Sequence, residues 1–260
     1  MRIKHFFEYK RLIGISVLSI FLGFVYAFST DVVNDENSIY TVFEKIVGYN
    51  DFYSFGFSNF QGILLIFILA LPIMNYYEKN LSKTSIFIFT RGNSKFKYFA
   101  EKFVFLGLYC LISALLFLIF KLLFSGYREI SADFVLCFFV FYLTLLTFSC
   151  GVCTLSIFIG SVNSYLVFVL IYCVLTLGVT ITYYKYNPVF MVVFILLNPV
   201  ARYMLSWYNG YFEMMNDRET QLMEPLVSVV YNIILLAAWA VALYFLLRNF
   251  DISLKQYDEE

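Results

Sequence analysis

Residues 133–159, DFVLCFFVFYLTLLTFSCGVCTLSIFI, carry a charged side chain only at Asp133, the first position. A helix that crosses the hydrocarbon layer of a bilayer needs about 20 mostly apolar residues. This stretch is longer than that, and at about 1.5 Å per residue its helix would extend beyond the layer unless it tilts. We therefore predict a transmembrane helix here that is tilted or that protrudes from the bilayer.

Further apolar blocks of similar length lie on both sides of this stretch. The chain is 62% hydrophobic and only 14% charged, whereas soluble domains carry about 25% charged residues. In lipid, backbone polar groups must be paired within the protein, and a helix pairs its own. The sequence predicts one all-α membrane domain over residues 1–260. Its six expected transmembrane helices cover residues 12–29, 60–77, 103–124, 133–160, 165–184 and 226–247. The first block also fits the apolar part of a signal peptide, but we expect a retained span.

The distribution of Lys and Arg predicts which ends of the helices face the cytoplasm. These residues gather in residues 1–11, in the segment 78–102 and in the C-terminal tail. Cytoplasmic loops of membrane proteins carry an excess of positive residues. Six spans place all three regions on one side, so we predict that both termini and the segment 78–102 are cytoplasmic. Lys121, near the outer end of the third block, is expected to snorkel to the interface.

Residues 1–11 are predicted to form an amphipathic helix that lies in the membrane interface. Ile3, Phe6, Phe7 and Lys10 fall at helical spacing within this short segment. A helix would then hold apolar side chains toward the lipid and basic ones outward.

Proline interrupts the apolar pattern at two places. Pro72 lies inside the second block and predicts a kink there. Pro188 and Pro199 bracket nine apolar residues, VFMVVFILL, which as a helix make roughly half a crossing. We expect residues 188–207 to form re-entrant or interfacial helices on the outer side. The alternative is a broken seventh span, which would place the C-terminus outside.

Several kinds of catalytic chemistry lack the residues that they need. The single histidine, His5, leaves no zinc site of the H-E-x-x-H type and no Ser-His pair within the spans. The chain has no G-x-x-x-x-G-K-[ST] loop to bind phosphates. We therefore expect no catalytic residue, no metal ligand and no enzymatic activity. Cys150 and Cys153 form a C-x-x-C within an apolar block, where small packing residues are expected.

Asn75 and Asn232 are polar residues within predicted spans. Asparagine in a membrane helix commonly forms a hydrogen bond to a neighbouring helix, and we expect that role for both. Binding of a substrate is the alternative.

The segment between the second and third spans is the most informative. Residues 79–102 have the sequence KNLSKTSIFIFTRGNSKFKYFAEK. Residues 90–93, TRGN, predict a break, after which a helix is expected to begin near Ser94. Phe96, Phe99 and Phe103 then follow at helical spacing into the third span. A cytoplasmic anchor explains the positive charge but does not require the length of the segment or its central glycine.

In the order of its features the chain resembles the six-span permease subunits of ABC-2 type ABC transporters, also called type V exporters. Four features carry the resemblance. They are the basic N-terminal segment, the segment 79–102 with its TRGNSKFKYFAEK pattern, the short turn between spans four and five, and the outer region with LLNPVARYM. In that family, the second feature forms a coupling helix that binds the ATPase, and the fourth forms re-entrant helices.

The resemblance implies roles for particular residues. An ATPase contact would include Ile86, Phe87, Phe89, Thr90, Arg91, Gly92, Asn93 and Lys95, and Arg91 would donate an ion pair. The interfacial helix would hold Arg2, Lys4, Phe6 and Phe7. A substrate cavity between two permease chains, lined by spans one, two and five, would include Phe21, Tyr26, Phe67, Asn75 and Tyr172.

The resemblance also implies partners and a location. The chain would work in a bacterial cytoplasmic membrane with a second permease chain and a separate ABC ATPase, which alone binds ATP and magnesium. An amphipathic peptide or another hydrophobic cargo would be exported, and no cofactor or nucleic acid is implied. The alternative is a scaffold or immunity protein that binds a partner at residues 79–102 without transport. A lipid-modifying enzyme is a third hypothesis, disfavoured by the missing histidines and acid pairs.

Overall fold

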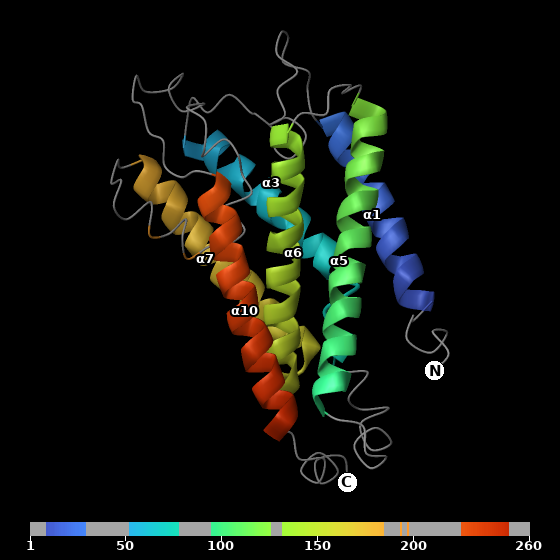
Figure 1. The fold of residues 1–260 in the computed structure, drawn as a ribbon. Coiled ribbons are helices and arrows are strands. Elements are labelled where there is room, and N and C mark those ends of the chain that lie inside the picture. The colour runs from blue at the N-terminus through green and yellow to red at the C-terminus, as the bar shows by residue number, and fades with distance from the viewer. Residues whose placement is uncertain are drawn as a thin grey trace.

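The computed structural model describes residues 9–29, 52–77, 95–125, 132–184 and 225–249, together with Val193 and Leu197. Within these ranges the chain is helical and contains no strand. The long helices are α1 (Tyr9–Ser29), α3 (Phe52–Ala70), α5 (Lys95–Ser125), α6 (Ala132–Ile159), α7 (Ser161–Tyr184) and α10 (Pro225–Asn249), shown in Figure 1.

Five of these helices are long and apolar enough to cross a membrane: α1, α5, α6, α7 and α10. The predicted all-α fold is thus confirmed for the described ranges. Crossing by α3 stays a prediction. Residues 1–8 of the predicted interfacial helix lie outside the described residues, whereas residues 9–11 begin the long helix α1. Most of residues 188–207 also lie outside them, so the re-entrant and seventh-span alternatives both stay open.

The second predicted span differs from the observed helix at both ends. Helix α3 begins at Phe52, before the predicted start at residue 60, and ends at Ala70, before the predicted end at residue 77. Residues 71–75 form a turn, in which the Leu71 N–H donates to the carbonyls of Phe67 and Ile68, each at 3.2 Å. Pro72 has no N–H to continue the helical pattern. At the expected kink the chain therefore forms a turn over residues 71–75, and α3 ends at Ala70.

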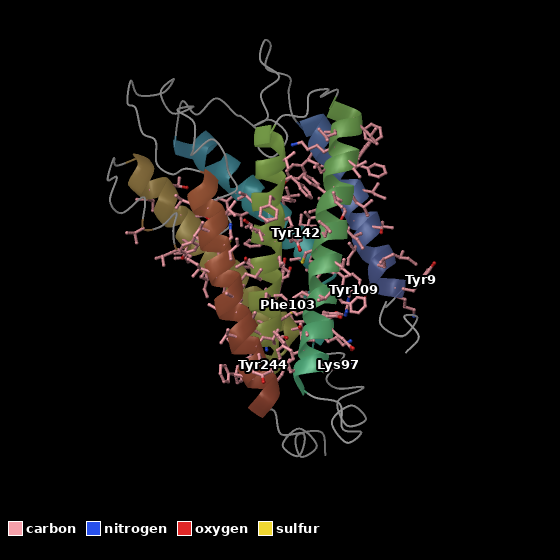
Figure 2. All side chains as sticks on the ribbon, in the orientation of Figure 1. Tyr9, Lys97, Phe103, Tyr109, Tyr142 and Tyr244 are labelled. Carbon is pink, nitrogen blue, oxygen red and sulfur yellow. The ribbon has the colours of Figure 1, made fainter. Side chains whose placement is uncertain are left out.

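Helix α5 confirms the helix expected to begin near Ser94. It runs without interruption from Lys95 to Ser125. Phe99 packs against Phe96 and Phe103, with ring centroids 6.5 and 5.7 Å away. Phe96 and Phe99 also contact Tyr244 of α10, which Figure 2 labels near the start of α5.

Helices α1 and α5 lie side by side and run in the same direction (Figure 1). The Ser19 and Ser113 hydroxyls are 3.0 Å apart in a buried hydrogen bond. At Gly23 the helices are so close that a Cβ atom would lie 2.7 Å from the Phe117 carbonyl oxygen. Small residues at such crossings allow backbones in a membrane to pack closely.

Helix α6 lies at the centre of the bundle and is the most buried span. Asn232 of α10 donates a hydrogen bond to the Thr144 hydroxyl at 3.4 Å, which confirms the expected interhelical role for this asparagine. Thr144 in turn donates to the Val140 carbonyl within its own helix at 2.8 Å. Gly151 meets the Phe168 ring of α7 and the Trp239 ring of α10.

The expected short turn between spans four and five is confirmed at Gly160. This residue has φ of 81°, a left-handed conformation that glycine adopts without a steric cost. Its carbonyl accepts from the Ser164 backbone N–H at 3.1 Å and from the Ser164 hydroxyl at 2.7 Å. The chain can therefore reverse between α6 and α7 with almost no connecting loop.

Helix ends that matter for function lie toward one end of the bundle. Helices α1 and α5 begin there, and α6 and α10 end there (Figure 1). The residues that flank the segment 78–94 are therefore near the start of α1 and the end of α10. That this end of the bundle faces the cytoplasm stays a prediction.

Candidate functional site

Two buried cations and several tyrosines lie together near the residues that precede and follow the segment 78–94. Arg11 comes from α1, and Asn75, Tyr76 and Tyr77 follow the break after α3. The others come from the first turns of α5. We call this group the cation–tyrosine cluster, and its members are Arg11, Asn75, Tyr76, Tyr77, Tyr98, Lys102 and Tyr109.

Arg11 links the start of α1 to the chain just before the segment. Its Nη2 donates to Asn75 Oδ1 at 2.7 Å, and its Cζ lies 4.9 Å from the centroid of the Tyr76 ring. Only 6% of the residue is exposed. The hydrogen bond confirms the interhelical role expected for Asn75, here with a charged partner.

Lys102 approaches the same tyrosine from α5. Its Nζ lies 5.2 Å from the Tyr76 ring centroid and 5.7 Å from that of Tyr98, and the residue is 5% exposed. Burying an ion costs several kcal/mol, whereas a desolvated cation–π contact contributes about 2 kcal/mol. Contacts to more than one ring therefore offset a substantial part of the cost of burial.

The tyrosine rings pack edge to face around this centre. Tyr76 lies 5.4 Å from Tyr77 and 5.5 Å from Tyr109, measured between ring centroids. Figure 2 shows Tyr109 projecting from α5. Such aromatic pairs contribute about 1 kcal/mol beyond the area they bury. The cluster thus joins three parts of the chain: the start of α1, residues 75–77 and the first half of α5.

A third buried cation, Lys121, lies further along α5. Lys121 is 0% exposed, and its Nζ lies 5.8 Å from the ring centroid of Tyr26 on α1. The prediction that Lys121 snorkels to the interface is therefore wrong. The reason is the close crossing at Gly23, where a Cβ atom would lie 3.1 Å from the backbone nitrogen of Lys121, so that α1 covers this part of α5.

The predicted coupling and interfacial residues are mostly beyond the described part of the chain. Residues 86–94 lie outside it, as do Arg2, Lys4, Phe6 and Phe7, so their roles stay predictions. Lys95 is the first residue of α5. The predicted coupling segment is thus continuous with a long helix.

The five predicted cavity residues do not gather at one place. Phe67 and Tyr172 are buried together, with ring centroids 6.5 Å apart, and both contact Phe148. Asn75 is in the cation–tyrosine cluster, whereas Tyr26 packs on α5 near Lys121. Phe21 is 59% exposed on the surface of α1. A cavity formed with a second chain stays a prediction.

The sequence interpretation missed the cation–tyrosine cluster. It counted Arg11 and Lys102 only as positive residues on the cytoplasmic side. Tyr98 and Lys102 are four residues apart, so their position on one face of α5 was readable from the spacing. The contact of both cations with Tyr76 depends on how α1 and the break after α3 pack, and no spacing in the sequence reveals it.

The cluster links three parts of the chain by a hydrogen bond, cation–π contacts and ring packing. Among the residues that the structure describes, no group of three His, Cys, Asp or Glu side chains could bind a metal. Cys110, Cys150 and Cys153 are buried free thiols within helices. Cys153 Sγ lies 3.9 Å from the Ile73 carbonyl oxygen, next to the break after α3.

Fold and sequence together define a multi-pass helical membrane protein with a buried cation–tyrosine cluster at one end of its bundle. No protein-family model and no curated protein matches the chain.

Proposed function

We propose that this protein is the membrane-spanning permease subunit of an ATP-driven exporter of the ABC-2 type. One observation carries the proposal. The basic segment 78–94 leads directly into α5, an unbroken helix of 31 residues that reaches through the bundle. A partner that displaces this segment would therefore move a long helix without an intervening loop to absorb the motion.

The energy would come from a separate ATPase bound at the segment. Nucleotide binding can shift the permease only as far as the ATPase binds its two conformations with different affinity. Arg91 and the neighbouring residues 86–95 would form the contact. The order of features along the chain supports this assignment, from the basic N-terminal segment to the outer region with LLNPVARYM.

The cargo would be an amphipathic peptide or another hydrophobic molecule. Aromatic residues make up 22% of the chain, and many large apolar side chains are exposed along α1, α7 and α10. These faces suit lipid, a second permease chain or an apolar cargo. The location would be a bacterial cytoplasmic membrane, with export as the direction of transport.

Affinity purification with coexpressed ABC ATPases tests the partner. The ATPases to use are those encoded beside this chain, and a mild detergent keeps the complex together. Arg91→Glu should abolish copurification, because it reverses the charge at the centre of the proposed contact. Lys255→Glu is the matched control, with the same charge change in the C-terminal tail, and should retain the ATPase. Failure of the unmodified chain to retain any ATPase would count against the proposal.

Reconstituted vesicles separate a transporter from a scaffold. A complex that moves a labelled amphipathic peptide only when ATP is present supports the permease. An intact, ATP-hydrolysing complex that moves no cargo would instead support a scaffold or immunity protein. The peptide is added on the side where the ATPase is bound.

A further inference from the structure

We infer that α1 and α5 move as one body when the segment 78–94 is displaced, with residues 71–75 as the hinge and the cation–tyrosine cluster as the joint. The inference rests on the proposed function, because it concerns how work done on the segment reaches the helices. It assigns to Tyr76 a positioning role.

The break after α3 has the properties of a hinge. In residues 71–75 the Ile73 and Met74 N–H groups both donate to the Ala70 carbonyl, at 2.9 and 3.1 Å. Pro72 contributes no N–H, so regular helical pairing does not continue across the turn. Hinges are commonly a few residues at the end of an element that absorb changes in φ and ψ. Motion of Tyr76 therefore need not rotate the body of α3.

The joint is stronger toward α1 and α5 than toward α6. Tyr76 contacts Arg11 of α1 together with Lys102 and Tyr109 of α5, and the neighbouring Asn75 accepts from Arg11. Toward α6, Cys153 Sγ donates a weak hydrogen bond to the Ile73 carbonyl at 3.9 Å, and Tyr77 lies beside the Cys150 and Cys153 thiols. Thiols are weak donors, whereas hydrogen bonds from a guanidinium are among the strong ones.

Helices α1 and α5 are held together along their whole contact. The cluster joins them at the base, and the Ser19–Ser113 hydrogen bond and the crossing at Gly23 follow in the middle. Lys121 and Tyr26 meet further along. A displacement delivered at one end is therefore transmitted to both helices.

The contact between α5 and α6 is better suited to sliding. Phe117 and Phe141 pack ring against ring at 5.7 Å, and the Tyr142 hydroxyl reaches the Gly107 carbonyl at 3.5 Å, the long limit of a hydrogen bond. The Cys110 thiol also lies beside the Ser149 hydroxyl of α6, and a thiol is a weak hydrogen-bonding group. Shear motions are small slides between packed helices. The inferred movement is therefore a shift of the α1–α5 pair against α6.

Two disulfide locks test which helices move together. Ser19→Cys with Ser113→Cys, in a Cys110→Ala background, places two thiols where hydroxyls are 3.0 Å apart and locks α1 to α5. Ser149→Cys beside the native Cys110 locks α5 to α6. ATP-driven transport is measured before oxidation, after oxidation and after reduction.

The two locks should give opposite results. Oxidation should leave transport unchanged in the α1–α5 variant, whereas it should stop transport reversibly in the α5–α6 variant. Loss of transport on locking α1 to α5, or full transport with α5 locked to α6, would overturn the inference. Formation of each disulfide is verified by mass spectrometry of the purified chain.

The joint is tested separately by Tyr76→Leu and Tyr76→Phe. The leucine variant removes the ring that both cations contact, so it should move less cargo per ATP hydrolysed. The phenylalanine variant keeps the ring and should match the unmodified chain. A merely structural role would instead lower the amount of complex and leave the ratio of cargo to ATP unchanged, which would overturn the assignment.

Limited trypsin digestion tests the joint without any ATPase. Cleavage at Lys79 and Lys83 should be faster in Tyr76→Leu than in the unmodified chain, and unchanged in Tyr76→Phe. Equal rates in all three would overturn the joint. If the unmodified chain binds no ATPase, the proposed function is wrong. The digestion needs no ATPase, so its result still shows whether Tyr76 holds the segment 78–94 against α1 and α5.

Discussion

At the scale of single residues, the most consequential feature is the pair of buried cations that share Tyr76. Arg11 and Lys102 come from helices far apart in the sequence, yet both lie within about 5 Å of one ring. Charges this deeply covered are stable only when aromatic faces and hydrogen bonds replace their water. The cluster therefore fixes where the chain before the segment 78–94 meets α1 and α5.

Gly23→Ala is predicted to destabilise the protein, whereas Gly14→Ala is not. A Cβ atom at Gly23 would lie 2.7 Å from the Phe117 carbonyl oxygen and 2.9 Å from Phe120 Cβ, but one at Gly14 would meet nothing within 4 Å. Forcing a methyl group into such a contact costs about 1–3 kcal/mol. Thermal unfolding of the two variants in the same detergent measures the difference. Equal unfolding temperatures would contradict the close crossing of α1 and α5.

At the scale of elements, helices pair through a few polar contacts within apolar surfaces. Asn232 of α10 and Thr144 of α6 form one such contact. The threonine donates to its own helix and accepts from the asparagine, so one hydroxyl serves both helices. The pairing of α10 with α6 thus depends on chemistry that hydropathy does not record.

A double-mutant cycle with Thr144→Val and Asn232→Leu should show a small positive coupling. Hydrogen bonds between membrane helices average about 0.6 kcal/mol in such cycles, and the 3.4 Å distance here favours a small value. Reversible unfolding in mixed detergent micelles measures the free energy of each variant. If the effects of the two single substitutions sum to the effect of the double substitution, the coupling free energy is zero and the hydrogen bond does not stabilise the protein.

At the scale of the whole molecule, the arrangement of helix ends supports the predicted topology. Helices α1 and α5 begin, and α10 ends, toward the same end of the bundle (Figure 1). An even number of crossings is required to bring a chain back to the side on which it began. The predicted sixth crossing through α3 satisfies that requirement together with the other five helices.

Cysteine accessibility in cells should reveal this topology. Ser85→Cys and Ser253→Cys are expected to react with an impermeant maleimide only after the membrane is opened. Ser131→Cys, between α5 and α6, should react in intact cells. The unmodified chain provides the background from its native thiols. Labelling of Ser85→Cys in intact cells would place the segment outside and remove the proposed ATPase contact with it.

Individual elements show how far the sequence could predict the fold. The phenylalanines at 96, 99 and 103 correctly predicted that α5 begins before its apolar block. Pro72 correctly predicted where the helix is interrupted. It did not predict that the chain forms a turn over residues 71–75, which depends on the tertiary packing. Lys121 was assigned to the interface because its depth was known from the pattern, while its neighbour α1 was not.

Composition and the length of the apolar blocks were enough to predict which stretches form helices that can cross a bilayer and where the basic segment interrupts them. Those properties follow from the free energy of transferring each segment from water into lipid, and this free energy depends on the segment's composition and length. Which helix faces meet depends on how the helices pack, and it is this packing that brings Arg11, Tyr76 and Lys102 into one buried site. Lipid tails are as apolar as leucine, so hydropathy cannot distinguish a face that packs on a helix from one that faces lipid.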